Sequence, residues 1–351
     1  MNKKSSRDPK KIVLVRLGAL GDVCMITPLL FALRRHFPES QIDWVIDRVN
    51  YPLVEGLKGV NLIPIEKPRS LKQYLNLYRQ FKLHRYDVLL LAQANLRVNV
   101  LSRLISAQKR YGFGRLHSHE AQYLFVNHYV KACKEHLVDA FMRFAEALGV
   151  TDLGVCWNLP RHSTADKWVL EQVPTQKYWA VCLSASKTER DWSLESYTSL
   201  IRYLRNKYDL TIVLIGGPDN REQQRANTCC HDLNDSKIFN LVGKSSVKQL
   251  KSLIEQADVL IAPDTGPVHI AVAVGTPVVG LYAVAPSSKT GPYRHLRWVV
   301  DAYEEGIRKL LRKKLDKISW RTRVHHPQAM YLVCIDEVIA RCEDLWESLK
   351  K

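Results

Sequence analysis

The sequence predicts an α/β protein with two domains, each built on a parallel sheet covered by helices. The chain has 351 residues, of which 46% are hydrophobic, and this is enough for two sizeable cores. Apolar runs of strand length alternate with helical segments along the chain. The alternation restarts after Pro160, so the pattern occurs twice.

Each predicted element follows from a local pattern. In the first half, apolar runs of strand length lie at residues 11–17, 42–46 and 87–92. In the second half they lie at residues 178–183, 210–215, 258–262 and 276–282. Residues 23–36 carry apolar side chains at helical spacing and stop before Pro38, which predicts a helix. The domain boundary is expected within residues 160–177, where prolines and polar residues cluster.

The segment 261–294 carries the most specific functional pattern. A strand is followed by Asp264 and Thr265, which are N-cap residues, then by Gly266 and by Pro267, which suits a first helical turn. The N–H donors and the dipole of such a helix attract phosphate, and Gly266 allows close approach to the backbone. The pattern therefore predicts a nucleotide diphosphate site. The alternative is that Asp264 and Thr265 only cap a buried helix.

The same region is long enough and apolar enough to cross a bilayer, since His269 is its one side chain that can carry charge near neutral pH between residues 266 and 286. Gly275 and Pro277 break any such helix, so we expect a helix, a turn and a strand instead. The first eleven residues include five basic side chains and lack the apolar core of a signal peptide. We expect a soluble, cytosolic protein. The eight cysteines show no metal-binding spacing, so we assign them no chemistry and predict no metal site.

The net charge of +17 is concentrated in two stretches. Residues 67–134 contain thirteen Lys or Arg against two acids, and residues 308–323 contain eight against one. Such patches raise the local concentration of anionic partners. Nucleic acid, an acidic membrane surface and a phosphorylated or carboxylated substrate all fit, and simple solubilising charge is the remaining alternative.

A loop with two glycines, Gly18 and Gly21, joins the first predicted strand to the first helix. It matches neither the GxGxxG dinucleotide fingerprint nor a phosphate-binding P-loop. Asp22 lies where the helix begins, and the helix dipole favours a negative charge there. From position alone, Asp22 is either a helix cap or a general base.

Four segments together resemble a known family. RLGALGDVCMITPLLFALRRHFP, GGP at residues 216–218, PDTGPVHIAVAVGTPVVGLY and SKTGPYR strongly resemble the ADP-heptose:lipopolysaccharide heptosyltransferases of glycosyltransferase family 9. The likeness runs from about residue 11 to residue 294 and is greatest to the heptosyltransferase I type. It implies the GT-B architecture: two Rossmann-like domains with parallel sheets facing a cleft.

The resemblance also implies a division of the chain. Residues 11–165 would form the acceptor-binding domain and residues 175–325 the nucleotide-sugar-binding domain. Residues 326–351 would return to the N-terminal domain, and residues 337–349 have the length and apolar spacing of a returning helix.

Members of this family are metal-independent and inverting, so the resemblance assigns roles to individual residues. Asp22 matches the catalytic base. The positive charge that stabilises the leaving group would come from Arg190, with Lys187 as its competitor. Thr265, Gly266 and Pro267 match the diphosphate turn, in which Asp264 would fix the loop. His269 would either contact phosphate or fill a core position. No cofactor is expected beside the donor ADP-heptose.

The remaining predicted contacts are less specific. Gly217 lies in a loop expected near the adenosine, with Asn220 and Glu222 as alternatives for contacting the ribose. The segment 283–286 departs from the Gly-Pro-Thr-Asp-Pro turn of many relatives, which leaves the contacts to the donor sugar open. Candidate acceptor-binding residues share a place in the glycine loop or the first basic stretch: Gly18, Gly21, Arg97, Arg103, Lys109, Arg110 and Arg115.

The expected function is transfer of L-glycero-D-manno-heptose from ADP-heptose to the Kdo region of the lipopolysaccharide inner core, as the first heptose on Kdo-lipid A. The basic tail and residues 308–323 would hold a monomeric enzyme on the anionic inner face of the inner membrane. One alternative is a later heptose addition or another nucleotide-sugar transferase of this fold. The other is a non-catalytic basic protein that binds nucleic acid, for which no recognition motif is present.

Overall fold

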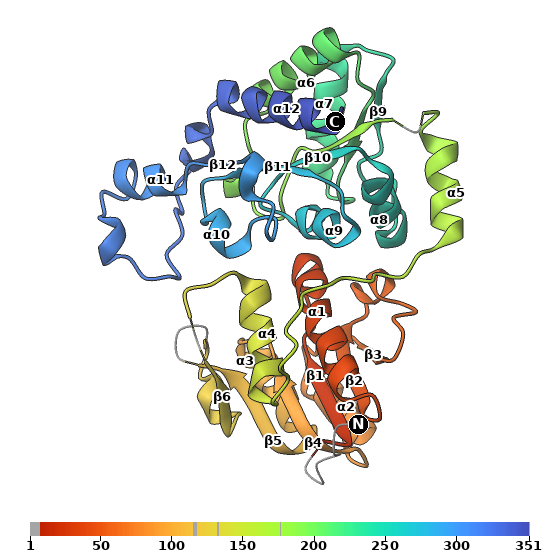
Figure 1. The fold of residues 1–351 in the computed structure, drawn as a ribbon, viewed down its shortest axis with the longest axis vertical. Helices are drawn as coiled ribbons and strands as arrows, with labels where there is room; N and C mark the ends of the chain where they lie inside the picture. Colours follow the sequence, from red (N-terminus) through yellow and green to blue (C-terminus); the bar gives the residue numbers. More distant parts are fainter. Residues whose placement is uncertain (1–7, 115–117, 132, 176, 351) are drawn as a thin grey trace. The chain divides into compact units, whose positions relative to one another are not determined.

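The computed structural model describes residues 8–114, 118–131, 133–175 and 177–350. The chain forms two compact units, Met1–Pro160 and Arg161–Lys351 (Figure 1). The observed boundary lies at the start of the predicted interval. Two parallel helix-covered sheets are present, as the sequence predicted.

The first unit contains a six-stranded sheet in the order β3-β2-β1-β4-β5-β6, with all neighbours parallel. Its strands are β1 (Lys11–Val15), β2 (Gln41–Asp47), β3 (Asn61–Ile65), β4 (Arg85–Leu91), β5 (Ser106–Phe113) and β6 (His128–Val130). Its helices are α1 (Leu20–His36), α2 (Leu71–Phe81), α3 (Leu96–Arg103) and α4 (Leu137–Ala147). Residues 12–15 of β1 are fully buried, because helices cover both faces of the sheet.

The second unit repeats this topology. Its sheet has the order β12-β11-β10-β7-β8-β9, again with parallel neighbours. Its strands are β7 (Trp179–Cys182), β8 (Ile212–Ile215), β9 (Ile238–Asn240), β10 (Val259–Pro263), β11 (Val278–Tyr282) and β12 (Val299–Asp301). Its helices are α5 (Ser163–Gln172), α6 (Leu194–Tyr208), α7 (Asn220–Leu233), α8 (Val247–Gln256), α9 (Gly266–Val274), α10 (Ser287–Thr290), α11 (Tyr303–Lys309) and α12 (Ile335–Leu349).

The strand order places one switch point in each sheet. In the first unit β1 lies between β2 and β4, so the chain leaves β1 toward one side and later returns to the other. In the second unit β7 lies between β8 and β10 in the same way. Ligands of open α/β sheets bind outside the carboxyl ends of the strands at such points. We therefore expect ligands to bind at the loops after β1, β4, β7 and β10.

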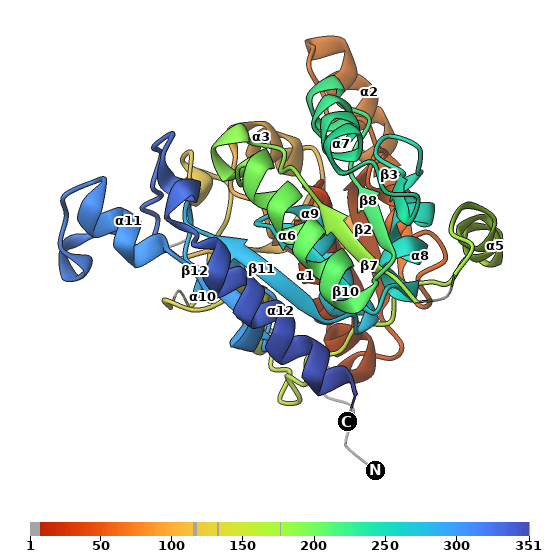
Figure 2. The same cartoon turned by 90° about the horizontal axis from the view of Figure 1, so that it is seen from above.

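The final helix, α12, packs on the second unit, where it contacts α6, β11 and β12 (Figure 2). The expected return of residues 326–351 to the N-terminal domain stays a prediction. The apolar face of α12 supplies Val338, Cys342 and Leu345 to the second core. Burial of these side chains explains why the helix packs there.

Within the described ranges, no helix combines the length and the apolar character that a membrane-spanning segment needs. The segment that raised this question from the sequence forms α9 and β11, with Gly275 ending the helix in a left-handed conformation.

Candidate active site

Asp22 lies in the first turn of α1, directly after the switch-point strand β1. Its Oδ2 accepts a hydrogen bond from the N–H of Ala19, the N-cap residue, at 2.9 Å. The capping role that the sequence allowed is therefore real. The Asp22 side chain nevertheless remains 25% exposed, so the same carboxylate is also accessible to a substrate.

Arg16 holds Asp22 from the other side. Its Nη2 lies 2.5 Å from Asp22 Oδ2, and its Nη1 donates to the carbonyl oxygen of Ala92 at 2.5 Å. Arg16 follows β1 and Ala92 follows β4, so this side chain joins the two strand ends at the switch point. The sequence analysis did not single out Arg16. The available signal was a charged side chain immediately after an apolar strand, and Arg16 is only 8% exposed.

One of the two glycines of this loop has an internal explanation. Asn50 Nδ2 donates to the carbonyl oxygen of Leu17 at 2.9 Å, and a Cβ on Gly18 would overlap this amide. Gly21 is buried in the first turn of α1. The Asn50 contact accounts for Gly18 without an acceptor, and the acceptor-binding role of both glycines stays a prediction.

The turn between β10 and α9 has the predicted form. Thr265 is the N-cap residue in an extended conformation, and Pro267 occupies the first turn. The Thr265 side chain makes no capping hydrogen bond to α9, so its hydroxyl is not used to satisfy the helix. The hydroxyl of Thr265 thus gives no support to the cap-only alternative, which stays a prediction for Asp264. First-turn N–H groups of a helix suit phosphate oxygens.

Arg190 and Asp264 connect the two loops at the switch point of the second sheet. Arg190 Nη1 lies 3.2 Å from both the backbone carbonyl oxygen and Oδ2 of Asp264. The two side chains are 15% and 9% exposed. Arg190 Nε is buried and has no hydrogen-bond partner among the described residues. The contact places a positive charge beside the N-terminus of α9, and it gives Asp264 the loop-fixing role expected of it.

Lys187, the alternative to Arg190 for stabilising the leaving group, lies in a different environment. Its side chain is exposed, whereas Arg190 lies inward at Asp264. Glu189, which lies between them in sequence, pairs with His325 Nδ1 at 2.8 Å. Burial alone would raise the pKa of Glu189, but the hydrogen bond from His325 and the positive charges of His325, Lys187 and Arg190 together lower it. The structure thus places Arg190 at the candidate diphosphate site, and the choice between Arg190 and Lys187 for the leaving group stays a prediction.

The loop after β7 is braced by residues that the sequence analysis missed. Asp191 Oδ1 accepts the N–H of Ala185 at 2.7 Å, and Asp191 Oδ2 pairs with Arg221 Nη1. Arg221 Nη2 also donates to the carbonyl oxygen of Ala185 at 2.6 Å. In the same loop the hydroxyl of Ser184 is buried without a partner among the described residues. A signal for Arg221 was present, because it lies three residues after Pro218 of the quoted Gly-Gly-Pro turn.

The two candidates for contacting the ribose, Glu222 and Asn220, lie in different environments. Glu222 Oε2 accepts the N–H of Gly217 at 2.7 Å, so this carboxylate helps to shape the turn. Asn220 is exposed at the start of α7. Glu222 is therefore engaged internally, and the choice of ribose contact stays a prediction. His269 is 7% exposed within α9, which fits the core-position alternative.

The predicted acceptor arginines are scattered. Arg97 is exposed in the first turn of α3, directly after β4, where a ligand would bind. Arg103 is exposed at the other end of that helix. Arg115 lies outside the described residues.

Arg110 was expected to contact the acceptor, and the structure gives it an internal role instead. Its side chain is 6% exposed, and its guanidinium donates to the carbonyl oxygens of Ser102, Ile105 and Phe125 at 2.5, 2.9 and 2.9 Å. Burial, together with the positive charge of Arg103, lowers the pKa of Arg110 to about 10. The guanidinium is thus committed to tying α3, β5 and the following loop together.

Replacing Arg110 by Met should therefore destabilise the first unit without weakening ADP binding. The substitution leaves three carbonyl groups without their donor, and each costs about 1–3 kcal/mol when buried. We expect thermal unfolding of the first unit at a clearly lower temperature, with ADP affinity measured by calorimetry on the folded variant unchanged. Normal stability combined with loss of acceptor binding would restore the original assignment.

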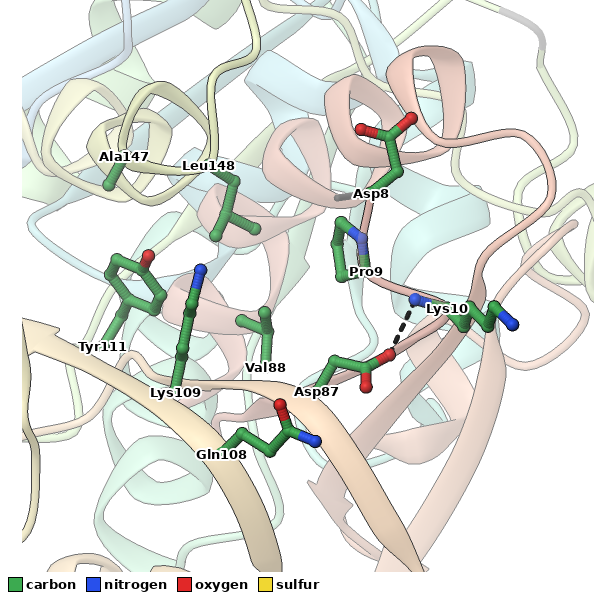
Figure 3. Close-up of a pocket in the computed structure, with 10 residues that line it drawn as sticks. All are labelled: Asp8, Pro9, Lys10, Asp87, Val88, Gln108, Lys109, Tyr111, Ala147 and Leu148. Atoms are coloured by element: carbon green, nitrogen blue, oxygen red, sulfur yellow. Dashed lines mark hydrogen bonds between the residues drawn. The ribbon is translucent and has the colours of Figure 1, made fainter. Parts of the chain in front are cut away.

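Lys109 lies toward the amino ends of the strands. It lines a cavity of about 480 Å³ together with Asp8, Asp87, Gln108 and Tyr111 (Figure 3). Asp87 Oδ2 accepts the backbone N–H groups of Lys10 and Lys11 at 2.7 and 2.9 Å, which closes one side of this hollow. The acceptor was expected at the carboxyl ends of the strands, and Lys109 lies away from that end of β5. The structure does not group it with Asp22.

Comparison with known proteins agrees with the sequence resemblance. The model of glycosyltransferase family 9 (heptosyltransferase) matches residues 74–317. A lipopolysaccharide core heptosyltransferase, OpsX, of Haemophilus influenzae is 31% identical, over 96% of this chain and 97% of its own. Lipopolysaccharide heptosyltransferase 3 of Escherichia coli is 22% identical, over 75% of this chain and 80% of its own.

Solved structures share the fold. A family 9 glycosyl transferase from Veillonella parvula superposes with a TM-score of 0.80 at 22% identity, covering 97% of this chain and 98% of that one. The E. coli heptosyltransferase WaaC with ADP gives 0.72 at 18% identity, covering 95% and 99%. The predicted GT-B architecture with two Rossmann-like sheets is confirmed. The chain belongs to glycosyltransferase family 9, the heptosyltransferase family.

Proposed function

We propose that this protein transfers L-glycero-D-manno-heptose from ADP-heptose to the Kdo region of the lipopolysaccharide inner core, in an inverting reaction that needs no metal. Family membership supports a heptosyltransferase, and the relative with 31% identity acts on the lipopolysaccharide core by its name. Membership also favours an enzyme over the nucleic-acid-binding protein that charge alone allowed.

The observation that carries the proposal is the contact of Arg190 with Asp264 beside the N-terminus of α9. A departing diphosphate needs positive charge and N–H donors that are already in place. Arg190 supplies the charge, and the first turn of α9 supplies the donors. This pairing performs the task that a metal ion has in other transferases.

Asp22 would act as the base on the acceptor. The acceptor hydroxyl oxygen forms a bond to the anomeric carbon as the bond from that carbon to the diphosphate oxygen breaks. The hydroxyl proton passes to the Asp22 carboxylate, and ADP leaves with the electron pair of the broken bond. The hydrogen bond from Ala19 and the pairing with Arg16 fix the orientation of the carboxylate.

The acceptor we propose is Kdo-lipid A, rich in phosphate and carboxylate, in keeping with the basic stretch 67–134. Arg97 is the best placed of the candidate contacts, because it follows the carboxyl end of β4. A monomeric enzyme held at the cytoplasmic face of the inner membrane by its exposed basic side chains would meet this lipid directly.

A second candidate is addition of a later heptose. Relatives include proteins named lipopolysaccharide heptosyltransferase 1 and 3 and lipooligosaccharide heptosyltransferase 2, so the family spans several positions in the core. The segment 283–286 departs from the turn of many relatives, so a donor other than ADP-heptose is a further alternative.

A donor screen tests the donor assignment. Calorimetric titration with ADP-heptose, ADP, ADP-glucose, a UDP-sugar and a GDP-sugar should give tight binding only for ADP-heptose and ADP. Tenfold tighter binding of another sugar nucleotide would contradict the proposed donor.

Gly266 separates the diphosphate turn from a simple helix cap. Replacing Gly266 by Val places a branched side chain at the first residue of α9. If phosphate lies against this backbone, ADP affinity should fall at least tenfold while the thermal unfolding temperature changes little. A variant that loses stability but keeps wild-type ADP affinity would favour the cap-only interpretation.

A further inference from the structure

Three cationic side chains, Lys289, Arg321 and Arg323, form a cluster beside the carboxyl end of β11. Lys289 lies in α10, and its Nζ donates to the carbonyl oxygen of Trp320 at 3.0 Å. The segment that carries both arginines is bound to the loop after β11, because the N–H of Val324 donates to the carbonyl oxygen of Val284 at 2.9 Å. The fold itself therefore brings the cation cluster together.

Gathering these charges costs free energy. Burial, reinforced by the positive charges of Arg323 and Arg321, lowers the pKa of Lys289 to about 8. All three side chains are partly buried, so water screens their repulsion incompletely. Residues 321 and 323 were assigned from the sequence to a membrane-facing basic stretch. Both are half-buried and their charges act on Lys289, whereas Lys313, Lys314 and Lys317 are exposed.

Several hydrogen-bond donors next to the cluster are unused. Arg323 Nη1, Trp320 Nε1 and Thr290 Oγ1 are buried and have no hydrogen-bond partner among the described residues. A buried donor without a partner costs about 1–3 kcal/mol, so such groups call for an ion, water or ligand. Three cations, one of which carries an unused donor, and two further unused donors beside them have the composition of an oxyanion site.

We propose that the cation cluster is a binding site for a phosphate-class oxyanion, separate from the donor diphosphate site. Three positive charges and donors from two chain segments suit the charge and several oxygens of a phosphate group. The donor diphosphate already has Arg190 and the N-terminus of α9. The assignment of the oxyanion to a substrate rests on the proposed function; the existence of the site does not.

The direct test is titration of the purified protein with inorganic phosphate at constant ionic strength. We expect saturable binding to the wild type, at least tenfold weaker in Lys289→Met and in Arg323→Met. Lys167→Met is the matched control, because it removes one exposed positive charge from α5 of the same unit, and it should bind phosphate normally.

Thermal unfolding separates this role from a structural one. In phosphate-free buffer Lys289→Met should unfold at the wild-type temperature or above it, since one repelling charge is removed. Lys289→Arg should restore phosphate binding. Absence of saturable binding to the wild type, or wild-type affinity in both Met variants, would overturn the proposal.

Two further measurements identify the source of the oxyanion. A tenfold higher KM of Lys289→Met for a phosphorylated acceptor, with no change for its unphosphorylated counterpart, would assign the group to the acceptor. An unchanged KM for both acceptors, with phosphate binding lost, would assign the site to the free ion. A parallel loss of ADP affinity would place the cluster in the donor site and contradict a separate one. The phosphate titration gives its answer even if no heptose transfer is found.

Discussion

Replacing Asp22 by Asn should reduce the rate of heptose transfer at least a hundredfold and leave ADP binding intact. An amide cannot accept the proton of the acceptor hydroxyl, and general base catalysis contributes about 10²- to 10⁴-fold. The Asn side chain keeps an oxygen that can accept the N–H of Ala19, so the helix start is preserved. Single-turnover transfer rates and ADP calorimetry on the same preparation measure both quantities.

Asp139→Asn is a matched control for this variant. Asp139 occupies the first turn of α4 as Asp22 occupies that of α1, and both substitutions remove one carboxylate from the first unit. The control should retain most of its transfer rate. Transfer at the wild-type rate by Asp22→Asn would end the assignment of Asp22 as base, and an equal loss in both variants would point to stability instead.

Replacing Arg190 by Gln should slow transfer by about 30-fold or more. That factor corresponds to a loss of about 2 kcal/mol of transition-state stabilisation, as expected when a charge-stabilising contact is removed. The exposed Lys187 provides the comparison, and Lys187→Gln should change turnover little. Steady-state rates at saturating donor are the measurement. Equal effects of the two substitutions would contradict the distinction drawn from the structure.

A double variant separates catalysis from simple disruption. Arg190→Gln leaves the Asp264 carboxylate, 9% exposed, without this partner, and an unpaired buried charge is destabilising. Adding Asp264→Asn removes that charge. If the slow transfer results from the missing cation at the diphosphate, the double variant should regain stability but remain slow. Recovery of the rate as well would show that Arg190 acts only by neutralising Asp264.

The central strands could be predicted because short, continuous apolar runs are typical of strands in the middle of a parallel sheet. β1, β4, β7, β8, β10 and β11 are apolar runs buried on both faces of a parallel sheet. β5 was missed because its first half, from Ser106 to Lys109, is polar and largely exposed. β3, β6, β9 and β12 are short or partly exposed strands at or near the sheet edges, where side-chain polarity is less constrained.

The sequence predicted the candidate site best where the site consists of a local backbone conformation, as at the turn before α9. It predicted less well which charged side chains form ion pairs. Arg190 and Lys187 are three residues apart and chemically similar, and only the fold shows that Arg190 reaches Asp264. Arg110 was misassigned because a basic sequence does not reveal which guanidinium is buried. Arg16 and Arg221 act through partners distant in sequence, at Ala92 and Ala185.

The most direct test of the central claim is mass spectrometry of the acceptor after reaction. Kdo-lipid A, with and without a phosphate on Kdo, is incubated with the purified protein and ADP-heptose in the presence of EDTA. Metal-independent transfer to the Kdo region predicts a mass gain of one heptose on at least one of the two acceptors. No gain on either acceptor, from a protein that still binds ADP, would contradict the claim.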